Sequence, residues 1–536
     1  MKNIFAVSSL EKVFPDSTNL AETEKFSMLK NEKKSFQIVF NAEKGEKISF
    51  EIDSPLKEFL KMFYVKRING GFIKADNSDD YYFEKSYDAY PDLLMPPDGS
   101  SFVAEDNGLN SIWVHICGDA LPVGVHSIHI TSKKGECIVE VAVIDAKLPK
   151  QELIYTNWFH TDCLMSVYGF EAFSDEYWRV TEAFLRRARE YGMNCVLTPL
   201  FTPPLDTKIG GERPTVQLVD VKVIGRNKYQ FSFEKLDKWL EMCDRCNIEY
   251  YEMSHLFTQW GARHAPKIIA EKNGVQKRIF GWRTIASGRR YRLFIEQLAK
   301  ALIAYIDKKG IREKCLFHVS DEPAGSMRYT YGKASAIVKN NFSGFKIIDA
   351  LSSYKLYQDG LIKTPIPATD HIEPFIGNVP ELWAYYCGAQ GSKCVSNRFF
   401  AMPSERNRIL GLQLYKFDVK GFLHWGYNFY YSQFSKGLID PFKVADAGGK
   451  FPSGDSFIVY PGKNGEPLDS LRLHIFYDAF QDMLALKLLE SKIGREKTLA
   501  IVEDGLAKPL TFSEYPHDAK WLEDVRERIN TAIAEN

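Results

Sequence analysis

The segment KCLFHVSDEP, residues 314–323, begins as an apolar strand and ends in two adjacent carboxylates. Residues 315–319 are mostly apolar, which is typical of a strand buried inside a protein. Pro323 lacks a backbone N–H and cannot continue a central strand. Asp321 and Glu322 therefore stand at the carboxyl end of the predicted strand. Where parallel strands end together in a barrel, polar residues at this edge are candidates for catalysis.

Strands alternate with helices on both sides of this segment. Helical periodicity is clearest at 175–191, 233–246, 289–309 and 405–417. Including 314–321, eight strands are predicted, near 152–159, 194–201, 249–256, 314–321, 345–351, 366–370, 382–387 and 421–427. This alternation predicts an α/β fold in which residues 149–445 form a (β/α)8 TIM barrel. Two long connections, 217–233 with its own hairpin and 259–287, follow the second and third strands, where barrels build their sites.

The regions before and after the barrel have different patterns. Residues 1–148 contain short alternating strands separated by Gly, Asn, Asp and Pro turns, which predicts an N-terminal β-sandwich. Residues 446–536 contain a Gly/Pro-rich segment, a long amphipathic helix near 468–489 and a shorter helix at the end. We expect this region to be a small helical extension that completes the barrel and packs on it.

Composition excludes several classes of protein. Lys and Arg together number 69, as do Asp and Glu, so the chain has no positive field to hold nucleic acid. No stretch approaches the ~20 apolar residues of a membrane span. Residues 1–12 lack the apolar core and cleavage site of a secretory signal. We expect a cytoplasmic protein, unless a leader has been removed, and we leave open whether it forms a homo-oligomer.

The carboxylate pair Asp321 and Glu322 suits glycosidic cleavage. The charge of one raises the proton affinity of the other, so one can stay protonated as a general acid. Successive side chains on a strand diverge, so the pair should not flank a sugar ring at the ~5 Å of an ordinary retaining enzyme. A division of labour fits better: one carboxylate orients a 2-acetamido group that attacks the anomeric carbon, and the other protonates the leaving group. The alternative is a solvated Asp-Glu pair at a helix start, with Pro323 in the first turn.

Several blocks of sequence share their order and spacing with a known family. The blocks are Ser320-Asp321-Glu322-Pro323, Leu382-Trp383-Ala384-Tyr385-Tyr386-Cys387, Asn397-Arg398 with Arg408, Gly421-Phe422-Leu423-His424-Trp425-Gly426-Tyr427-Asn428, Gly454-Asp455, Tyr460-Pro461-Gly462, Asp469-Ser470-Leu471-Arg472 and Asp482. Through them most of the chain resembles glycoside hydrolase family 123, the β-N-acetylgalactosaminidase family. The resemblance implies a β-sandwich before a β/α barrel and an exo-acting, retaining, substrate-assisted mechanism without a cofactor. It implies that Asp321 holds the acetamido group and that Glu322 is the acid/base. The family commonly has Trp-Trp-Tyr-Thr-Cys where this chain has Trp383-Ala384-Tyr385-Tyr386-Cys387, so one sugar-contacting aromatic is in doubt.

Further substrate-binding candidates follow from their position at strand ends. Aromatic side chains there could form a platform for a sugar, while His, Asn and Asp could bind hydroxyl groups. For each of them a role in the core or in a loop is the alternative. The candidates are Asn157 and His160 after the first strand, His255 after the third, Asp370 after the sixth, Trp383 and Tyr385 on the seventh, and Trp425 and Asn428 at the eighth.

Two other functions compete with a glycosidase that acts on β-linked N-acetylhexosamine glycans. One is a metal-dependent enzyme similar to sugar isomerases, with ligands drawn from His318, Asp321, Glu322, Asp370, His371 and Glu373. His318 and Asp321 are three residues apart on a strand, which places them on opposite faces and makes a shared metal unfavourable. We therefore expect no metal. The other alternative is an inert barrel that only binds carbohydrate, since a fold alone does not define a function.

Overall fold

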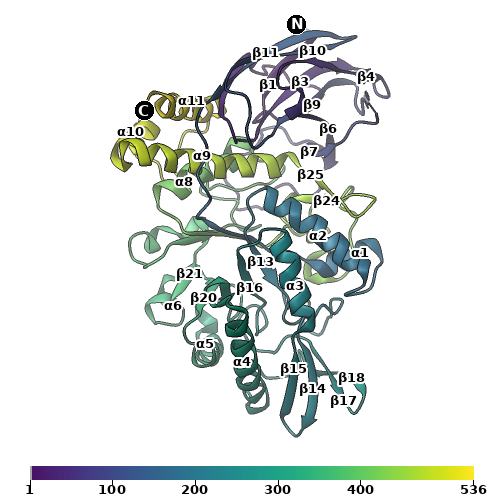
Figure 1. The fold of residues 1–536 in the computed structure, drawn as a ribbon, viewed down its shortest axis with the longest axis vertical. Helices are drawn as coiled ribbons and strands as arrows, with labels where there is room; N and C mark the ends of the chain where they lie inside the picture. Colours follow the sequence, from purple (N-terminus) through teal and green to yellow (C-terminus); the bar gives the residue numbers. More distant parts are fainter. Residues whose placement is uncertain (1–2, 100) are drawn as a thin grey trace.

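A computed structural model describes residues 3–99 and 101–536. Its centre is a sheet of eight parallel strands, in the spatial order β21, β20, β19, β16, β13, β12, β23, β22 (Figure 1). A single bridge between Ala368 and Tyr385 joins the two ends of the sheet, so the barrel is nearly closed. The strands are β12 (Ile154–Asn157), β13 (Cys195–Thr198), β16 (Tyr250–Met253), β19 (Cys315–Phe317), β20 (Lys346–Ala350), β21 (Thr364–Ile366), β22 (Trp383–Tyr385) and β23 (Gly421–His424). The predicted eight-stranded parallel barrel is confirmed, although every strand is shorter than predicted, and the fourth and sixth strands each end four residues before the predicted limit.

The barrel interior is filled by side chains from alternate positions of the strands. Trp383 and Tyr385 share an apolar cluster with Leu197, Leu316 and Leu423 inside the barrel. Gly421 pairs with Trp383 across neighbouring strands, and a Cβ at Gly421 would lie 2.2 Å from the Trp383 ring. Only glycine leaves room for the indole there, so the large ring and the missing side chain are complementary.

Helices cover the outside of the barrel. The observed helices include α1 (Thr161–Tyr168), α2 (Asp175–Glu190), α3 (Glu234–Arg245), α4 (Arg289–Lys309), α5 (Arg328–Asn341) and α6 (Tyr354–Gln358). Ser174 caps α2 by accepting a hydrogen bond from Tyr177 N. The helix predicted over 405–417 is divided at Ile409 into α7 (Ser404–Arg408) and α8 (Leu410–Lys416).

The N-terminal region consists of β-sheets, as predicted. Two of these sheets pack face to face around one apolar core, in which Ile38 and Ile112 of one sheet meet Ile128 and Val141 of the other. In order across the sheets, the strands are β1 (Ile4–Ser8), β3 (Lys34–Ala42), β9 (Gly108–Ile116), β6 (Leu60–Asn69) and β7 (Ala89–Met95), then β2 (Lys25–Leu29), β11 (Gly135–Ile144), β10 (Gly124–Ser132) and β5 (Glu51–Asp53). A small pair, β4 (Lys47–Ser49) and β8 (Ser101–Val103), completes the region.

The helix α9 (Leu471–Ile493) lies between the N-terminal sheets and the barrel (Figure 1). The sequence predicted a one-sided helix near 468–489, but α9 is buried around most of its circumference because α8 covers one side and β7 another. Arg472 at its start donates to both carboxylate oxygens of Asp92 on β7, at 2.7 and 3.0 Å. Two shorter helices, α10 (Arg495–Glu503) and α11 (Ala519–Glu535), pack on α9.

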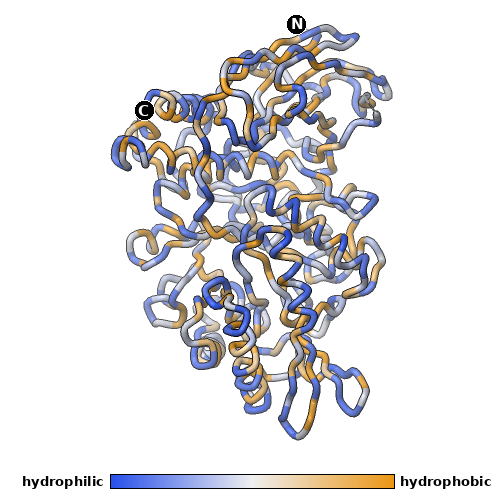
Figure 2. Tube along the Cα trace, viewed as in Figure 1, coloured by the Kyte–Doolittle hydropathy of each residue, from blue (hydrophilic) through white to orange (hydrophobic). Residues whose placement is uncertain are grey.

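The two long connections meet in a second small sheet. The predicted hairpin is present as β14 (Asp220–Gly225) and β15 (Lys228–Ser232). The connection after β16 adds β17 (Ile268–Lys272) and β18 (Val275–Phe280), so that the four strands form one sheet in the order β15, β14, β17, β18. This sheet projects from the barrel (Figure 1), and both polar and apolar residues occur along it (Figure 2). Among the residues that the structure describes, no helix combines the length and apolar character that crossing a membrane requires.

Candidate active site at the carboxyl ends of the barrel strands

A cavity of about 640 Å³ opens at the carboxyl ends of the barrel strands. Asp321 and Glu322 both line it, together with the aromatic side chains of Trp158, Tyr385 and Trp425. This is the size and the mixture of apolar walls and a few polar groups that small-molecule sites have. The carboxylate pair predicted from the sequence therefore faces a cavity that has several aromatic side chains in its walls.

A larger depression of about 960 Å³ lies at the opposite ends of the strands, around Lys150 and Lys314. Its charged side chains pair with one another at the surface, as Lys150 does with Glu249 at 2.8 Å. Exposed pairs of this kind are common on protein surfaces and contribute little. We therefore place the candidate site in the cavity that contains the carboxylate pair.

The two carboxylates reach one cavity because the backbone turns between them. Strand β19 ends at Phe317, and Glu322 has φ = 43°, in the left-handed region that residues other than glycine rarely adopt. Its backbone N–H donates to Ala350 O on the neighbouring strand at 3.1 Å, which holds this conformation. The side chains thus do not diverge as they would on an extended strand. Local strain of this kind is concentrated at functional sites.

Glu322 is held by groups from β22 and the residues that follow it. Tyr385 Oη donates to Glu322 Oε1 at 2.7 Å, and the Cys387 thiol lies 3.9 Å from the same oxygen. Desolvation in the cavity raises the pKa of Glu322, and these two donors only partly oppose the effect. A carboxyl group with a raised pKa is suited to general acid catalysis near neutral pH.

Asp321 is buried, with 6% of its surface exposed. Gln259 Nε2 donates to Asp321 Oδ2 at 2.8 Å. Burial, followed by the charge of Glu322, raises the pKa of Asp321 well above its usual range. The two carboxylates therefore compete for ionisation, and one of them retains its proton more readily than an exposed carboxyl group would.

A buried ionic network supports the strand end from behind. His318 lies between Glu252 and Asp349, with Nε2 2.5 Å from Glu252 Oε1 and Nδ1 3.0 Å from Asp349 Oδ1. Burial alone would lower the pKa of His318, but the two carboxylates outweigh it and raise the pKa to about 9. Asp349 also accepts hydrogen bonds from the backbone N–H groups of Val319 and Ser320, at 3.1 Å each. The network thereby fixes the two residues that precede Asp321.

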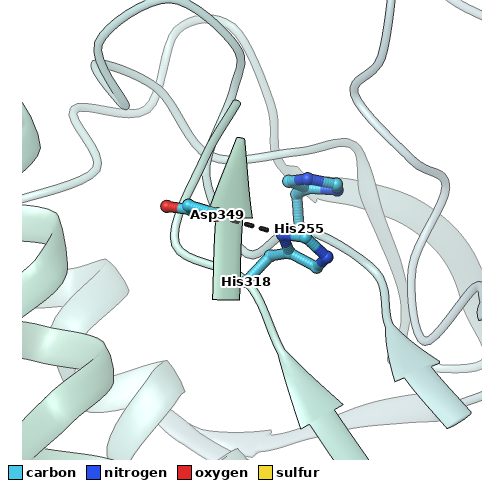
Figure 3. A group of neighbouring side chains, drawn as sticks. All are labelled: His255, His318 and Asp349. Atoms are coloured by element: carbon cyan, nitrogen blue, oxygen red, sulfur yellow. Dashed lines mark hydrogen bonds and ion pairs between the residues drawn. The ribbon is translucent and has the colours of Figure 1, made fainter. Parts of the chain in front are cut away.

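The neighbouring His255 lies against this network (Figure 3). Its ring stacks on the His318 ring with 4.2 Å between centroids, and burial together with the charge of His318 lowers its pKa well below the usual range. His255, His318 and Asp349 could present ligand atoms within 4.8 Å of one another. However, both nitrogens of His318 already face carboxylates, and Asp349 accepts bonds from His318, Tyr331 and two backbone groups. This arrangement fits an ion network better than a metal site, which needs free lone pairs.

A third carboxylate, Asp455, lies in the cavity. Its Oδ2 accepts a hydrogen bond from Trp425 Nε1 at 3.0 Å, and burial raises its pKa to about 7 although Arg398 acts in the opposite direction. Its Oδ1 has no hydrogen-bond partner among the described residues and lies 3.5 Å from His424 Nε2. Asp455 was part of a block that the sequence analysis quoted, but it was not named there as a site residue.

Of the eight predicted substrate-binding residues, only Tyr385 and Trp425 line the cavity. His160 and Asn428 bind each other through His160 N to Asn428 Oδ1 at 2.8 Å and Asn428 Nδ2 to His160 O at 3.2 Å. Asn157 donates to Tyr155 Oη at 3.1 Å. All three side chains are buried. His160 and Asn428 join the segment after the first strand to the segment after the eighth, whereas Asn157 bonds within its own strand.

The remaining predicted residues do not line the cavity. Asp370 Oδ1 lies 2.7 Å from His371 Nδ1 and accepts from Gln390 at 3.2 Å. Trp383 lies inside the barrel and donates to Glu381 Oε1 at 2.8 Å. His255 belongs to the ionic network described above. Position at a strand end therefore gave the correct edge of the barrel for Asp370 and His255 but not the direction of their side chains, and Trp383, the first residue of β22, lies toward the opposite end of its strand.

Several lining residues come from loops that the sequence analysis did not resolve. Gln259 and Trp260 belong to the long connection after β16, and Phe434 to the loop after β23. Phe72 comes from the N-terminal region, where its N–H donates to Asp446 Oδ2 at 2.9 Å. The length of the connection after the third strand was the signal that pointed to Gln259 and Trp260. No comparable signal marked Phe72.

Comparison with known proteins identifies the family of the chain. The catalytic-domain model of glycoside hydrolase 123 matches residues 158–489, more than half of the 536 residues. A family 123 glycoside hydrolase from Clostridium perfringens, described for the details of glycolipid glycan hydrolysis, has a similar structure, with a TM-score of 0.75 and 14% identity over 99% of this chain and 98% of that chain. A GH10 endoxylanase from a sugarcane soil metagenome has a TM-score of only 0.34, with 12% identity over 62% of this chain and 97% of its own. No curated protein matches the sequence. Because the catalytic-domain match begins directly after β12, the first barrel strand, and extends into α9, the chain belongs to glycoside hydrolase family 123 and is a glycosidase.

Proposed function

We propose that this glycosidase is an exo-acting β-N-acetylgalactosaminidase that retains configuration and uses the 2-acetamido group of its substrate as the nucleophile. The observation that carries the proposal is the shared cavity of Asp321 and Glu322, neighbours in sequence that the left-handed backbone at Glu322 turns toward one space. Carboxylates on adjacent residues are poorly placed to act from both faces of a sugar ring, as an ordinary retaining mechanism requires. They suit a substrate whose own acetamido group is the nucleophile.

In the proposed first step, Asp321 accepts a hydrogen bond from the acetamido N–H. The acetamido carbonyl oxygen attacks the anomeric carbon, the glycosidic C–O bond breaks, and the leaving oxygen takes the proton of Glu322. Asp321 stabilises the positive charge that develops on the oxazolinium ring. Burial and the charge of Glu322 raise the pKa of Asp321 in the free enzyme, but the positive charge of the ring beside it acts in the opposite direction and favours the ionised carboxylate. In the second step, water attacks the anomeric carbon, the acetamido oxygen leaves, and Glu322 takes the proton of the water. Two inversions give net retention.

The surroundings of each carboxylate support these roles. Gln259 holds Asp321 through Oδ2, and the proposal assigns Oδ1 to the acetamido N–H. Tyr385 fixes the orientation of Glu322, while desolvation keeps its pKa raised as an acid requires. The aromatic side chains of Trp158 and Trp425 provide apolar surface for a sugar ring. The match to the C. perfringens family 123 glycoside hydrolase, whose description concerns glycolipid glycans, makes such glycans suitable substrates to test.

The decisive experiment compares azide rescue in two variants with an activated aryl N-acetyl-β-galactosaminide. Asp321→Asn should lower kcat by about 10² or more, as expected for the loss of a preorganised electrostatic partner, and azide should not restore turnover. Glu322→Ala is the matched control, because azide needs no general base and should trap the intermediate as a glycosyl azide of retained configuration.

Two outcomes would contradict the proposal. An inverted glycosyl azide from Asp321→Asn would show that azide replaces a missing enzymic nucleophile. Efficient hydrolysis of the corresponding 2-hydroxy glycoside by the wild type would show that no acetamido group is needed. Parallel assays with N-acetyl-glucosaminides, which differ at one hydroxyl group, test the sugar assignment.

A further inference from the structure

Two aromatic side chains at the mouth of the cavity have no role in the proposed mechanism. Trp260 and Phe434 both line the cavity, and their rings meet edge to face with 5.8 Å between centroids. Trp260 is 38% exposed and Phe434 is half-buried, whereas Trp158 and Tyr385 deeper in the cavity are 2% and 5% exposed. The cavity therefore has a buried aromatic floor and a separate aromatic rim that faces solvent.

The backbone at both rim residues is strained. Trp260 has φ = 53° and Phe434 has φ = 62°, and the nearby Ala262 and Ser435 are also left-handed at 55° and 51°. Residues that have a Cβ rarely adopt this backbone conformation unless the surrounding structure imposes it. Two loops far apart in sequence thus each present an aromatic ring at the same edge through an unfavourable backbone, which suggests a function for the pair rather than chance exposure.

Asp206 joins the two loops. Its Oδ2 accepts from Phe434 N at 2.8 Å, and its backbone O accepts from Ser435 Oγ at 2.7 Å. On the other side, the backbone N of Asp206 donates to Gln259 Oε1, and Gln259 Nε2 donates to Asp321 Oδ2. A continuous set of hydrogen bonds therefore connects the rim at Phe434 to the carboxylate Asp321.

The geometry points to a subsite formed by Trp260 and Phe434 for the first sugar of the leaving group. This inference rests on the proposed function, because an exo-acting enzyme holds the terminal sugar at the buried floor and the leaving group must then extend past the rim. The exposed face of Trp260 suits the apolar face of a neutral sugar ring. Asp206 fixes the backbone at Phe434, Trp260 N donates to the backbone O of Asp321 at 3.1 Å, and Gln259 joins Asp206 to the Asp321 carboxylate.

The test uses two substrates that share the same N-acetyl sugar and differ in the leaving group. One is a disaccharide in which that sugar is β-linked to a neutral hexose, and the other is the β-glycosyl fluoride, whose leaving group has no ring. Trp260→Ala and Phe434→Ala should each lower kcat/KM for the disaccharide about tenfold, mainly through KM, in line with the loss of an aromatic contact. Both should leave the fluoride within about twofold, since the lost contact is absent from that reaction. Tyr329→Ala removes an aromatic side chain that is 72% exposed outside the cavity and should change neither substrate.

Equal losses on both substrates, or no loss on the disaccharide, would overturn the subsite. If the wild type cleaves neither substrate in the galacto or gluco series, the proposed function fails, and the subsite is then tested by binding alone. In calorimetry the wild type should bind the disaccharide more tightly than the free N-acetyl monosaccharide, and Trp260→Ala should lose this preference. A preference that survives in Trp260→Ala would refute the assignment without reference to activity.

Discussion

His318 should remain protonated well above neutral pH, and this charge should make a measurable contribution to stability. The ordinary pKa of 6.5 is raised to about 9 by Glu252 and Asp349, which outweigh the cost of burial. The difference corresponds to about 3 kcal/mol, at about 1.4 kcal/mol for each pH unit. Because the folded state binds the proton more tightly than the unfolded chain, this stabilisation is fully present below pH 6.5 and is lost as the pH rises through about 9.

Two measurements test this expectation. Urea unfolding of the wild type should show a free energy of unfolding that falls by about 3 kcal/mol between pH 6.5 and pH 9.5, apart from contributions of other groups. Histidine-selective ¹⁵N NMR assigns the effect to one residue: both nitrogens of His318 should be protonated at pH 7.5. His255, which stacks on His318 and has a lowered pKa, should be neutral under the same conditions. A neutral His318 at pH 7.5 would refute the reasoning, even if the stability profile had the expected slope.

Three further predictions concern the carboxylate pair and its surroundings. Glu322→Gln should lower turnover of substrates with poor leaving groups much more than that of activated aryl glycosides, because activated groups depart without a proton; equal losses in steady-state assays would argue against Glu322 as the acid. Tyr385→Phe removes a hydrogen bond that lowers the pKa of Glu322. Because Glu322 would then hold its proton to higher pH, the alkaline limb of the pH profile of kcat/KM should move to higher pH. An unchanged limb would argue against this contact. Exhaustive treatment with EDTA should leave activity unchanged, since His318 and Asp349 are already engaged with other groups; a loss that one divalent ion restores would favour a metal enzyme.

The barrel could be predicted because its signals are local. The apolar run at 315–319 and the helical periodicity of residues 289–309 are each contained in one segment, and the structure has a strand and a helix there. The pairing of β14 with β17 is different, because Lys222 and Glu271 are partners across two separate loops. Periodicity shows that a strand is present but not which distant strand it joins. The same limit applies to α9, since its own sequence does not show that the N-terminal sheets cover its second face.

In the candidate site, the sequence predicts the position of a residue along the barrel but not the direction of its side chain. A strand end fixes the height of a residue in the barrel, so Asp321, Tyr385 and His160 were all placed at the correct edge. Direction depends on backbone angles and on partners far away in sequence, and it is these that turn His160 toward Asn428 and Glu322 toward the cavity. The left-handed angle at Glu322 is not favoured by glutamate itself; it is imposed by the surrounding structure, including the hydrogen bond to Ala350 O. The two carboxylates can therefore be recognised from sequence as a pair, whereas their shared cavity exists only once β20 and the loops after β16 and β23 have folded around them.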